Sequence, residues 1–218
     1  MLLALATLWG ASYSFIRVGV ETIPPVTLIA ARTVIAGTLL LLVIAARHVP
    51  MPRDPMSWRN FTVQALLNSV VPFTLIAWGQ QVVEAGLATI LNSTAPIFTF
   101  LFTWTLTRHE PVTVRKLVGV IAGLAGVALI VGMQALGGIG RELWSQLAIV
   151  AATVCYAGAA IFGRTFSGHA PIVPAAGSML CGAAIGVVFL GESLSGTAWA
   201  GLVCVVLGVA AMTVPARK

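Results

Sequence analysis

Charged side chains are scarce in this sequence. Only 8% of its 218 residues are Asp, Glu, Lys or Arg, whereas soluble domains carry roughly 25%. Hydrophobic residues instead make up 59% of the chain. No water-soluble core needs that much apolar sequence, so the composition argues against a soluble domain and indicates an integral membrane protein.

The residues of catalytic and metal sites are also sparse. Cys155, Cys181 and Cys204 lie inside apolar runs and form no CxxC pair, so we interpret them as small packing residues. No HExxH motif or phosphate-binding loop is present, and the three histidines fall in short loops. We therefore expect no metal, no cofactor and no enzyme activity. The net charge of +6 is spread between apolar segments rather than gathered in a stripe, so we expect no nucleic-acid partner.

Long apolar segments fill almost the whole chain. A membrane-spanning helix needs roughly 20 mostly apolar residues. The length of the runs and their lack of alternation argue against barrel strands. The sequence predicts an all-α, polytopic transmembrane bundle of about eight helices, with membrane lipid around it. The predicted helices cover residues 2–20, 26–46, 61–82, 85–107, 113–133, 145–165, 173–190 and 196–214.

The distribution of Lys and Arg predicts the orientation. With the N-terminus inside, nine of the 12 basic residues fall on the inner side, Arg17 and Arg141 fall outside, and Arg32 lies within a span. Short cytoplasmic loops are enriched in Lys and Arg. We expect a multi-pass protein of the inner (plasma) membrane with both termini in the cytoplasm.

Two sets of landmarks recur along the chain, which indicates an internal repeat. Trp9 and Arg17 recur at an offset of 147 residues as Tyr156 and Arg164. A Glu that opens a glycine-bearing helix recurs at an offset of 82. The residues of this second set are Glu110, Gly119 and Gly126, repeated as Glu192, Gly201 and Gly208.

The two offsets differ by 65 residues, about the length of two spans with their loops. We therefore predict a first repeat over residues 1–137, with five helices, and a shortened second repeat over 141–218, with three. The counterparts of the segments 26–46 and 61–82 would be missing. Loss of an even number of helices preserves the orientation of the downstream helices, so the copies are inverted relative to each other.

The sequence resembles the EamA-type members of the drug/metabolite transporter superfamily. The stretches that carry the resemblance are Trp9-Gly10 with Arg17, Ala31-Arg32, Leu91-Asn92-Ser93-Thr94-Ala95-Pro96, and Leu190-Gly191-Glu192. The resemblance implies two inverted repeats of five helices each. It also implies a carrier of amino acids, metabolites, nucleotide sugars or drugs, without giving the substrate.

Arg32 is the most costly residue to place in a membrane. A charge at the centre of a spanning helix costs about 2.5–3.5 kcal/mol on insertion scales. One interpretation is that Arg32 faces a central cavity and pairs with an anionic group of the substrate. The alternative is that it lies about one turn from the helix start and reaches the interface or a neighbouring carbonyl.

Other polar and aromatic residues within the spans could line the same cavity, because polar groups in lipid need partners or water. Packing between helices is the alternative for each of them. The candidate substrate-binding residues besides Arg32 are Trp9, Tyr13, Asn68, Trp78, Gln80, Asn92 and Thr94.

Two kinds of residue predict how the helices bend and pack. Pro72 and Pro96 each remove a backbone hydrogen bond within a span, so they could act as hinges or as kinks without a ligand role. Glycines at helical spacing allow two backbones to approach closely. The packing glycines we expect are Gly119, Gly123, Gly126, Gly201 and Gly208, of which the last two could join a homodimer interface.

These observations predict a secondary carrier or exporter of small metabolites such as amino acids or drugs, working by alternating access. The alternative is a shortened paralogue that does not transport and instead scaffolds or regulates a membrane partner. The missing pair of helices keeps that alternative open, since the second repeat offers few polar lining residues beyond Tyr156 and Ser178.

Overall fold

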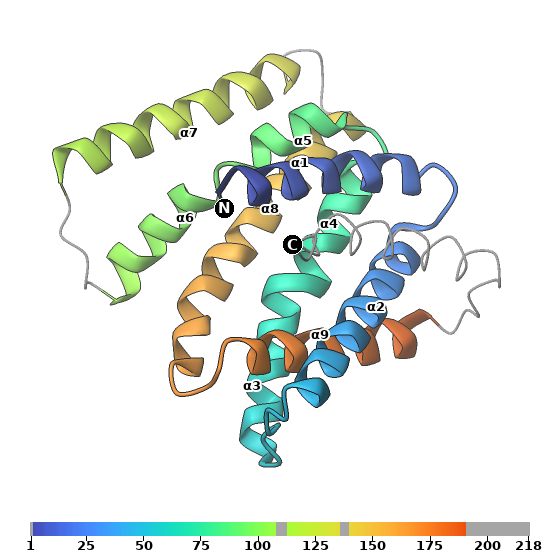
Figure 1. The fold of residues 1–218 in the computed structure, drawn as a ribbon. Helices are drawn as coiled ribbons and strands as arrows, with labels where there is room; N and C mark the ends of the chain where they lie inside the picture. Colours follow the sequence, from blue (N-terminus) through green and yellow to red (C-terminus); the bar gives the residue numbers. More distant parts are fainter. Residues whose placement is uncertain (1, 108–112, 136–139, 191–218) are drawn as a thin grey trace, which may run out of the picture.

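The protein is helical throughout the residues that the computed structural model describes, which are 2–107, 113–135 and 140–190 (Figure 1). No strand occurs within those ranges. The α-helices are α1 (Leu2–Gly19), α2 (Pro25–Ala46), α3 (Pro55–Ala65), α4 (Val71–Gly79), α5 (Ala85–Asn92), α6 (Ala95–Phe102), α7 (Val114–Ala135), α8 (Arg141–Phe162) and α9 (Ile172–Leu190). Three shorter helical turns complete the described chain: η1 (Leu66–Val70), η2 (Thr103–Thr107) and η3 (Gly163–Phe166).

Seven of the eight predicted segments are helical in the described part of the chain, and the eighth, 196–214, lies outside it. Four described helical stretches are long and apolar enough to cross a membrane: Pro25–Ala46, Pro55–Gly79, Ala85–Thr105 and Arg141–Phe166. A shorter apolar helix covers Ile172–Gly186. The helical fold class is therefore as expected.

Two predicted spans are not single regular helices. The predicted helix 61–82 begins earlier, at Pro55, and contains the π-helical turn η1 directly before α4, in which Pro72 is the second residue. The predicted helix 85–107 is broken at Ser93 and Thr94 into α5 and α6. In both cases a proline without an N–H follows the irregular turn, so one regular hydrogen bond cannot form there.

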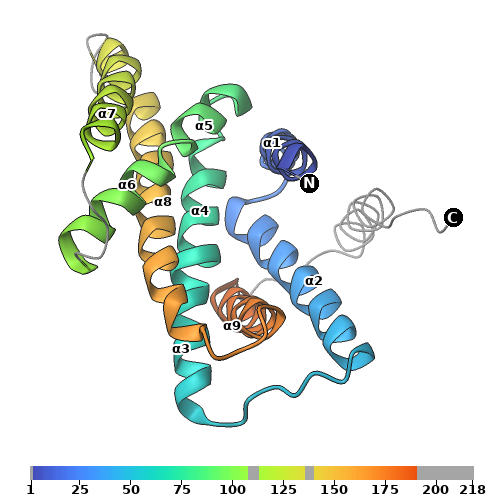
Figure 2. The ribbon, with the colours of Figure 1, turned by 60° about the vertical axis from the view of Figure 1, so that its left-hand side comes forward.

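Helix α8 occupies the centre of the described bundle. It packs against α4, α5, α6 and α7, and Figures 1 and 2 both show α4 and α8 side by side. Its buried face mixes small and polar residues with Ile149, which is fully buried. Side chains of α1, α4, α5 and α8 share one apolar core, so the first helix of the predicted second repeat is embedded among helices of the first.

Helix α9 lies between α2 and α3, as the turned view shows (Figure 2). Small residues make this contact close. A Cβ on Gly186 would lie 2.7 Å from the Cβ of Ala30, and one on Gly182 would lie 3.7 Å from the Cγ2 of Thr33. The hydroxyl of Thr33 donates to the carbonyls of its own helix, so it presents its methyl group to α9. Close van der Waals contacts of this kind drive the association of helices in lipid, where no hydrophobic effect acts between them.

The five predicted packing glycines have different surroundings. A Cβ on Gly123 would lie 2.3 Å from the Cδ1 of Ile97, so α7 approaches α6 closely there. The Cβ positions of Gly119 and Gly126 meet no atom within 4 Å. Gly201 and Gly208 lie outside the described residues, as do Glu110 and Glu192 of the repeat landmarks.

Candidate functional site

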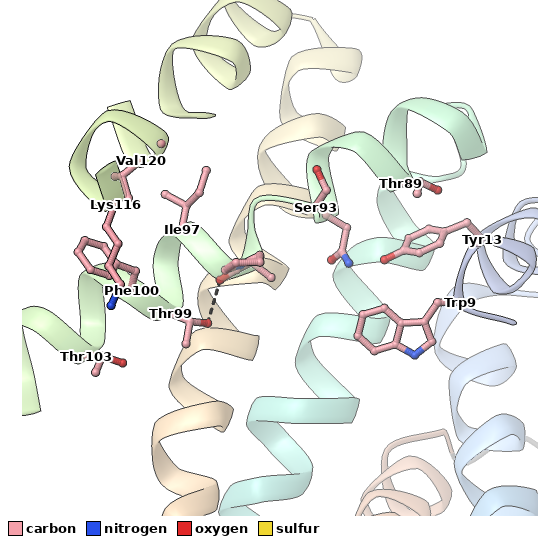
Figure 3. Close-up of a pocket in the computed structure, with 15 residues that line it drawn as sticks. Trp9, Tyr13, Thr89, Ser93, Ile97, Thr99, Phe100, Thr103, Lys116 and Val120 are labelled. Carbon is pink, nitrogen blue, oxygen red and sulfur yellow. Dashed lines mark hydrogen bonds between the residues drawn. The ribbon is translucent and has the colours of Figure 1, made fainter. Parts of the chain in front are cut away.

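A cavity of about 1020 Å³ lies between α1, α5, α6 and α7 (Figure 3). Most of its lining is apolar. Five of the predicted site residues line it: Trp9, Tyr13 and Asn92 as substrate-binding residues, Pro96 as a hinge and Gly119 as a packing glycine. Other lining residues include Thr89, Ser93, Phe100, Thr103 and Lys116.

Helix α1 supplies one wall of the cavity. Trp9 is 64% exposed, and Figure 3 shows its ring beside that of Tyr13 on the same side of the space. Tyr13 is only 8% exposed, so it reaches from the cavity into the core that α1 shares with α4 and α8. An aromatic pair with this arrangement can stack on a flat or apolar ligand while a phenol offers a hydrogen bond.

The break between α5 and α6 supplies the polar part of the lining. Asn92 ends α5 and is 7% exposed, and its Oδ1 accepts no hydrogen bond from any described residue. Pro96 has no N–H to donate to the carbonyl of Asn92, which would be its partner in an unbroken helix. A mid-span break that leaves polar atoms beside a cavity is typical of ligand sites in transporters.

The wall of the cavity formed by α6 and α7 was not predicted from the sequence. The ammonium of Lys116 lies 5.7 Å from the centre of the Phe100 ring, a cation–π contact. The sequence places Lys116 only among the basic residues of an inner loop. The spacing of the two residues along the chain gives no signal for their contact, because it depends on how α7 folds back against α6.

Arg32 lies in a second cluster. Its guanidinium carbon is 4.5 Å from the centre of the Phe73 ring on α4. Phe73 in turn meets the Tyr156 ring of α8 edge to face, with ring centres 6.4 Å apart. Tyr13 and Tyr156 are both close enough to Arg32 to interact with its charge. Tyr13 thus belongs to this cluster and to the cavity lining.

A family comparison covers the helices that build this site. The EamA-like transporter family model matches residues 1–132, which include α1 to α6 and most of α7. The chain belongs to the EamA-like transporter family.

Several transporters are similar to this EamA-like chain. The uncharacterized inner membrane transporter YedA of Escherichia coli (strain K12) is 30% identical over 197 residues, which cover 88% of this chain and 60% of YedA. The uncharacterized transporter YoaV of Bacillus subtilis (strain 168) is 23% identical over 172 residues, covering 79% of this chain and 59% of YoaV. This chain therefore spans about 60% of the length of these relatives. No solved structure gives a significant match.

The other predicted site residues of this family member lie away from the cavity. Gln80 is fully buried, and its Nε2 donates to the backbone carbonyl of Tyr13 (3.0 Å), so it ties the end of α4 to α1. The Oγ1 of Thr94 donates to the Leu91 carbonyl and lies 3.3 Å from the Oγ1 of Thr153 on α8. Asn68 lies in η1 and Trp78 is partly exposed near the end of α4.

The two arginines expected outside lie at one end of the bundle. Arg17 donates to the backbone carbonyl of Gln80, and the Nη2 of Arg141 donates to the Oε1 of Gln81 (3.3 Å). Both therefore hold the turn that joins α4 to α5. A cation beside the carbonyls that end a helix is favourable. Within the described residues, no group of three or more His, Cys, Asp or Glu side chains could hold a metal ion.

Proposed function

We propose that this chain is a secondary carrier of small metabolites and that its substrate binds in the cavity between α1, α5, α6 and α7. One observation carries the proposal: a spanning segment breaks beside the cavity and leaves the side-chain oxygen of Asn92 buried without a partner among the described residues. A buried carbonyl without a hydrogen bond costs about 1–3 kcal/mol, which a bound substrate or water would recover. The names of YedA and YoaV as transporters support the same class.

Alternating access would use the two irregular turns. Pro72 follows η1 and Pro96 follows the break after Asn92, so each lies where the helix has lost regular hydrogen bonds and can bend at low cost. In this proposal the repeat 1–137, which supplies the whole lining of the cavity, moves against the repeat 141–218, whose helix α8 packs against α4, α5, α6 and α7. The inverted, shortened second repeat and cytoplasmic termini belong to the proposal, and so does a homodimer that completes the thin second-half wall.

The substrate-binding residues of the proposal fall into two groups. Trp9, Tyr13 and Asn92 line the cavity directly. Arg32 would reach the substrate through the cluster that it shares with Tyr13. Gln80, Thr94, Asn68 and Trp78 would act indirectly, by holding α1, α8 and the irregular turns in place.

Counterflow in proteoliposomes tests the proposal. Purified protein would be reconstituted in vesicles loaded with members of a metabolite panel, and uptake of the labelled compound would be measured. For a compound that exchanges, Asn92→Leu should reduce uptake about tenfold, equivalent to about 1.4 kcal/mol, since the substrate loses its polar partner. Asn60→Leu makes the same chemical change on α3, outside the cavity, and should leave uptake unchanged.

A folded protein that exchanges no compound and binds no small molecule would contradict the carrier and favour the alternative, a shortened paralogue that scaffolds or regulates a membrane partner. The missing pair of helices in the predicted second repeat is the reason to keep this alternative. Equal loss of uptake in Asn92→Leu and Asn60→Leu would instead remove the cavity from the proposal.

A further inference from the structure

Arg32 has no polar partner in the described part of the chain. A guanidinium carries five N–H donors in one plane. None of them has a hydrogen-bond or ion-pair acceptor within 2–107, 113–135 and 140–190, where the group lies instead against the Phe73 ring. A cation–π contact is worth about 2 kcal/mol when desolvated, and it does not replace the hydrogen bonds that water would give those donors.

None of the described acidic residues forms an ion pair with Arg32. Glu21 follows α1, Asp54 and Glu84 directly precede α3 and α5, and Glu142 is in the first turn of α8. Arg32 is in the second turn of α2, beside the core residue Ala31. The positive charge therefore has no carboxylate in direct contact with it among these residues.

Two phenols complete the surroundings of the guanidinium. Tyr13 comes from α1 and Tyr156 from α8, and both interact with the charge of Arg32. Neither hydroxyl has a hydrogen-bond partner among the described residues. Three groups that can donate to an anion thus lie within electrostatic range of one another on α1, α2 and α8, two helices of the predicted first repeat and one of the second.

The cluster is also connected to the cavity. Tyr13 lines the cavity beside Trp9, and its ring is otherwise buried in the core next to α4 and α8. Arg32 and Tyr156 do not line the cavity themselves, so a ligand that lies against Trp9 would reach them past the side chain of Tyr13. The lining contains no carboxylate that could pair with an ammonium group of such a ligand.

We propose that Arg32, Tyr13 and Tyr156 bind the carboxylate of an organic acid whose apolar part lies against Trp9 in the cavity. The inference rests on the proposed carrier function and names its substrate class. A guanidinium pairs with a carboxylate through two parallel hydrogen bonds, and each phenol can donate one more. The same site disfavours amines, because an ammonium would approach Arg32 without a counter-charge.

Three compounds with one six-carbon chain test the substrate class: hexanoate, hexanamide and hexylamine. Their binding to the purified protein would be measured by calorimetry in a neutral detergent without lipid, which removes lipid phosphate as a competing anion. Hexanoate should bind at least about tenfold more tightly than the other two, a difference of about 1.4 kcal/mol. Equal binding of the three compounds, or no binding of hexanoate, would overturn the inference.

Substitutions test the roles of Arg32 and Tyr156 in hexanoate binding. Arg32→Gln should abolish the preference for hexanoate, Arg32→Lys should keep part of it as a point charge, and Tyr156→Phe should weaken hexanoate binding about threefold without changing the fold. Asn60→Leu changes a polar residue of α3, outside the cavity, and should leave the preference intact. Unchanged hexanoate binding in a folded Arg32→Gln, or in Tyr156→Phe and Arg32→Lys together, would contradict the site.

The counterflow assay separates this inference from the carrier itself. Exchange of neutral or cationic compounds that persists in Arg32→Gln would leave the carrier standing and overturn the anion site. Binding of hexanoate that depends on Arg32, without exchange of any compound, would support the site and contradict the carrier.

Discussion

Helices α9 and α7 both carry glycines at helical spacing, but they meet their neighbours in different ways. On α9, a Cβ on Gly186 would lie 2.7 Å from Ala30, and one on Gly177 would lie 2.4 Å from the Cδ2 of Phe61. On α7, the Cβ positions of Gly119 and Gly126 meet nothing within 4 Å. The glycines of α9 are therefore needed for its contacts, while those two glycines of α7 are not.

The difference shows that glycine spacing permits close packing without requiring it. Gly119 lies on the lining of the candidate cavity, where open space is the functional feature. Gly177 lies against Phe61, which is fully buried and stacked on Phe166 with ring centres 5.5 Å apart. Helix α9 is thus closely packed at Gly177 and Gly186, whereas α7 is closely packed at Gly123 and open at Gly119 and Gly126.

The largest expected effect is on stability, and it comes from adding a methyl group to α9, with the same change on α7 as the comparison. Gly177→Ala should lower the free energy of unfolding by about 1–3 kcal/mol, because the new Cβ forces the ring of Phe61 to move within a packed core. Gly126→Ala adds the same methyl group in open space and should be neutral or stabilise by up to about 1 kcal/mol, since Ala has the higher helix propensity. Thermal unfolding in detergent micelles, followed by circular dichroism, would measure both.

Equal effects of the two substitutions would remove the distinction between the packed glycine of α9 and the open glycine of α7. A loss of stability in Gly126→Ala alone would reverse it, because a close helix contact would then lie at Gly126.

Long apolar runs predicted the helices well because they depend only on local sequence. The segments 26–46 and 145–165 correspond closely to α2 and to α8 with η3. The break after Asn92 was indicated only as a hinge at Pro96, since a proline can kink a helix or divide it. Which of the two occurs depends on tertiary contacts, such as that of Thr94 with Thr153 on α8.

The candidate site was predictable only in part. Tyr13, Gln80 and Asn92 are candidates from the sequence because they are polar residues within spans. The sequence alone does not distinguish the fully buried Gln80 from the cavity-lining Asn92. Phe73 carries no sequence signal, because an apolar residue in a span is the rule. Its role appears only where α4 brings its ring against Arg32.

A smaller effect is expected where the break between α5 and α6 meets α8. Thr94→Val removes the hydroxyl that bonds the Leu91 carbonyl and faces Thr153, so it should cost about 0.5–1 kcal/mol of stability. Thr94→Ser keeps the hydroxyl and is the control. In a double-mutant cycle with Thr153→Val, the coupling energy should be about 0.6 kcal/mol, a typical value for polar contacts between membrane helices. A coupling of zero would mean that α8 does not hold the break through this contact.

The smallest effect is expected at the exposed start of α3, the helix that packs against α9. Asp54 caps α3, and its carboxylate accepts hydrogen bonds from the backbone N–H (2.7 Å) and the hydroxyl (3.0 Å) of Ser57, which hold the pKa of Asp54 below its usual value. The ionised form is therefore favoured by folding. The ionised carboxylate of Asp54 therefore contributes to folding stability above the unfolded-state pKa of about 3.9, and this contribution is lost as the pH falls through the lower folded-state pKa.

Asp54→Asn keeps a good capping residue that does not titrate. The difference in melting temperature between wild type and Asp54→Asn should thus be slightly positive at about pH 6 and shrink below about pH 4, and a difference that grows on acidification would contradict the cap.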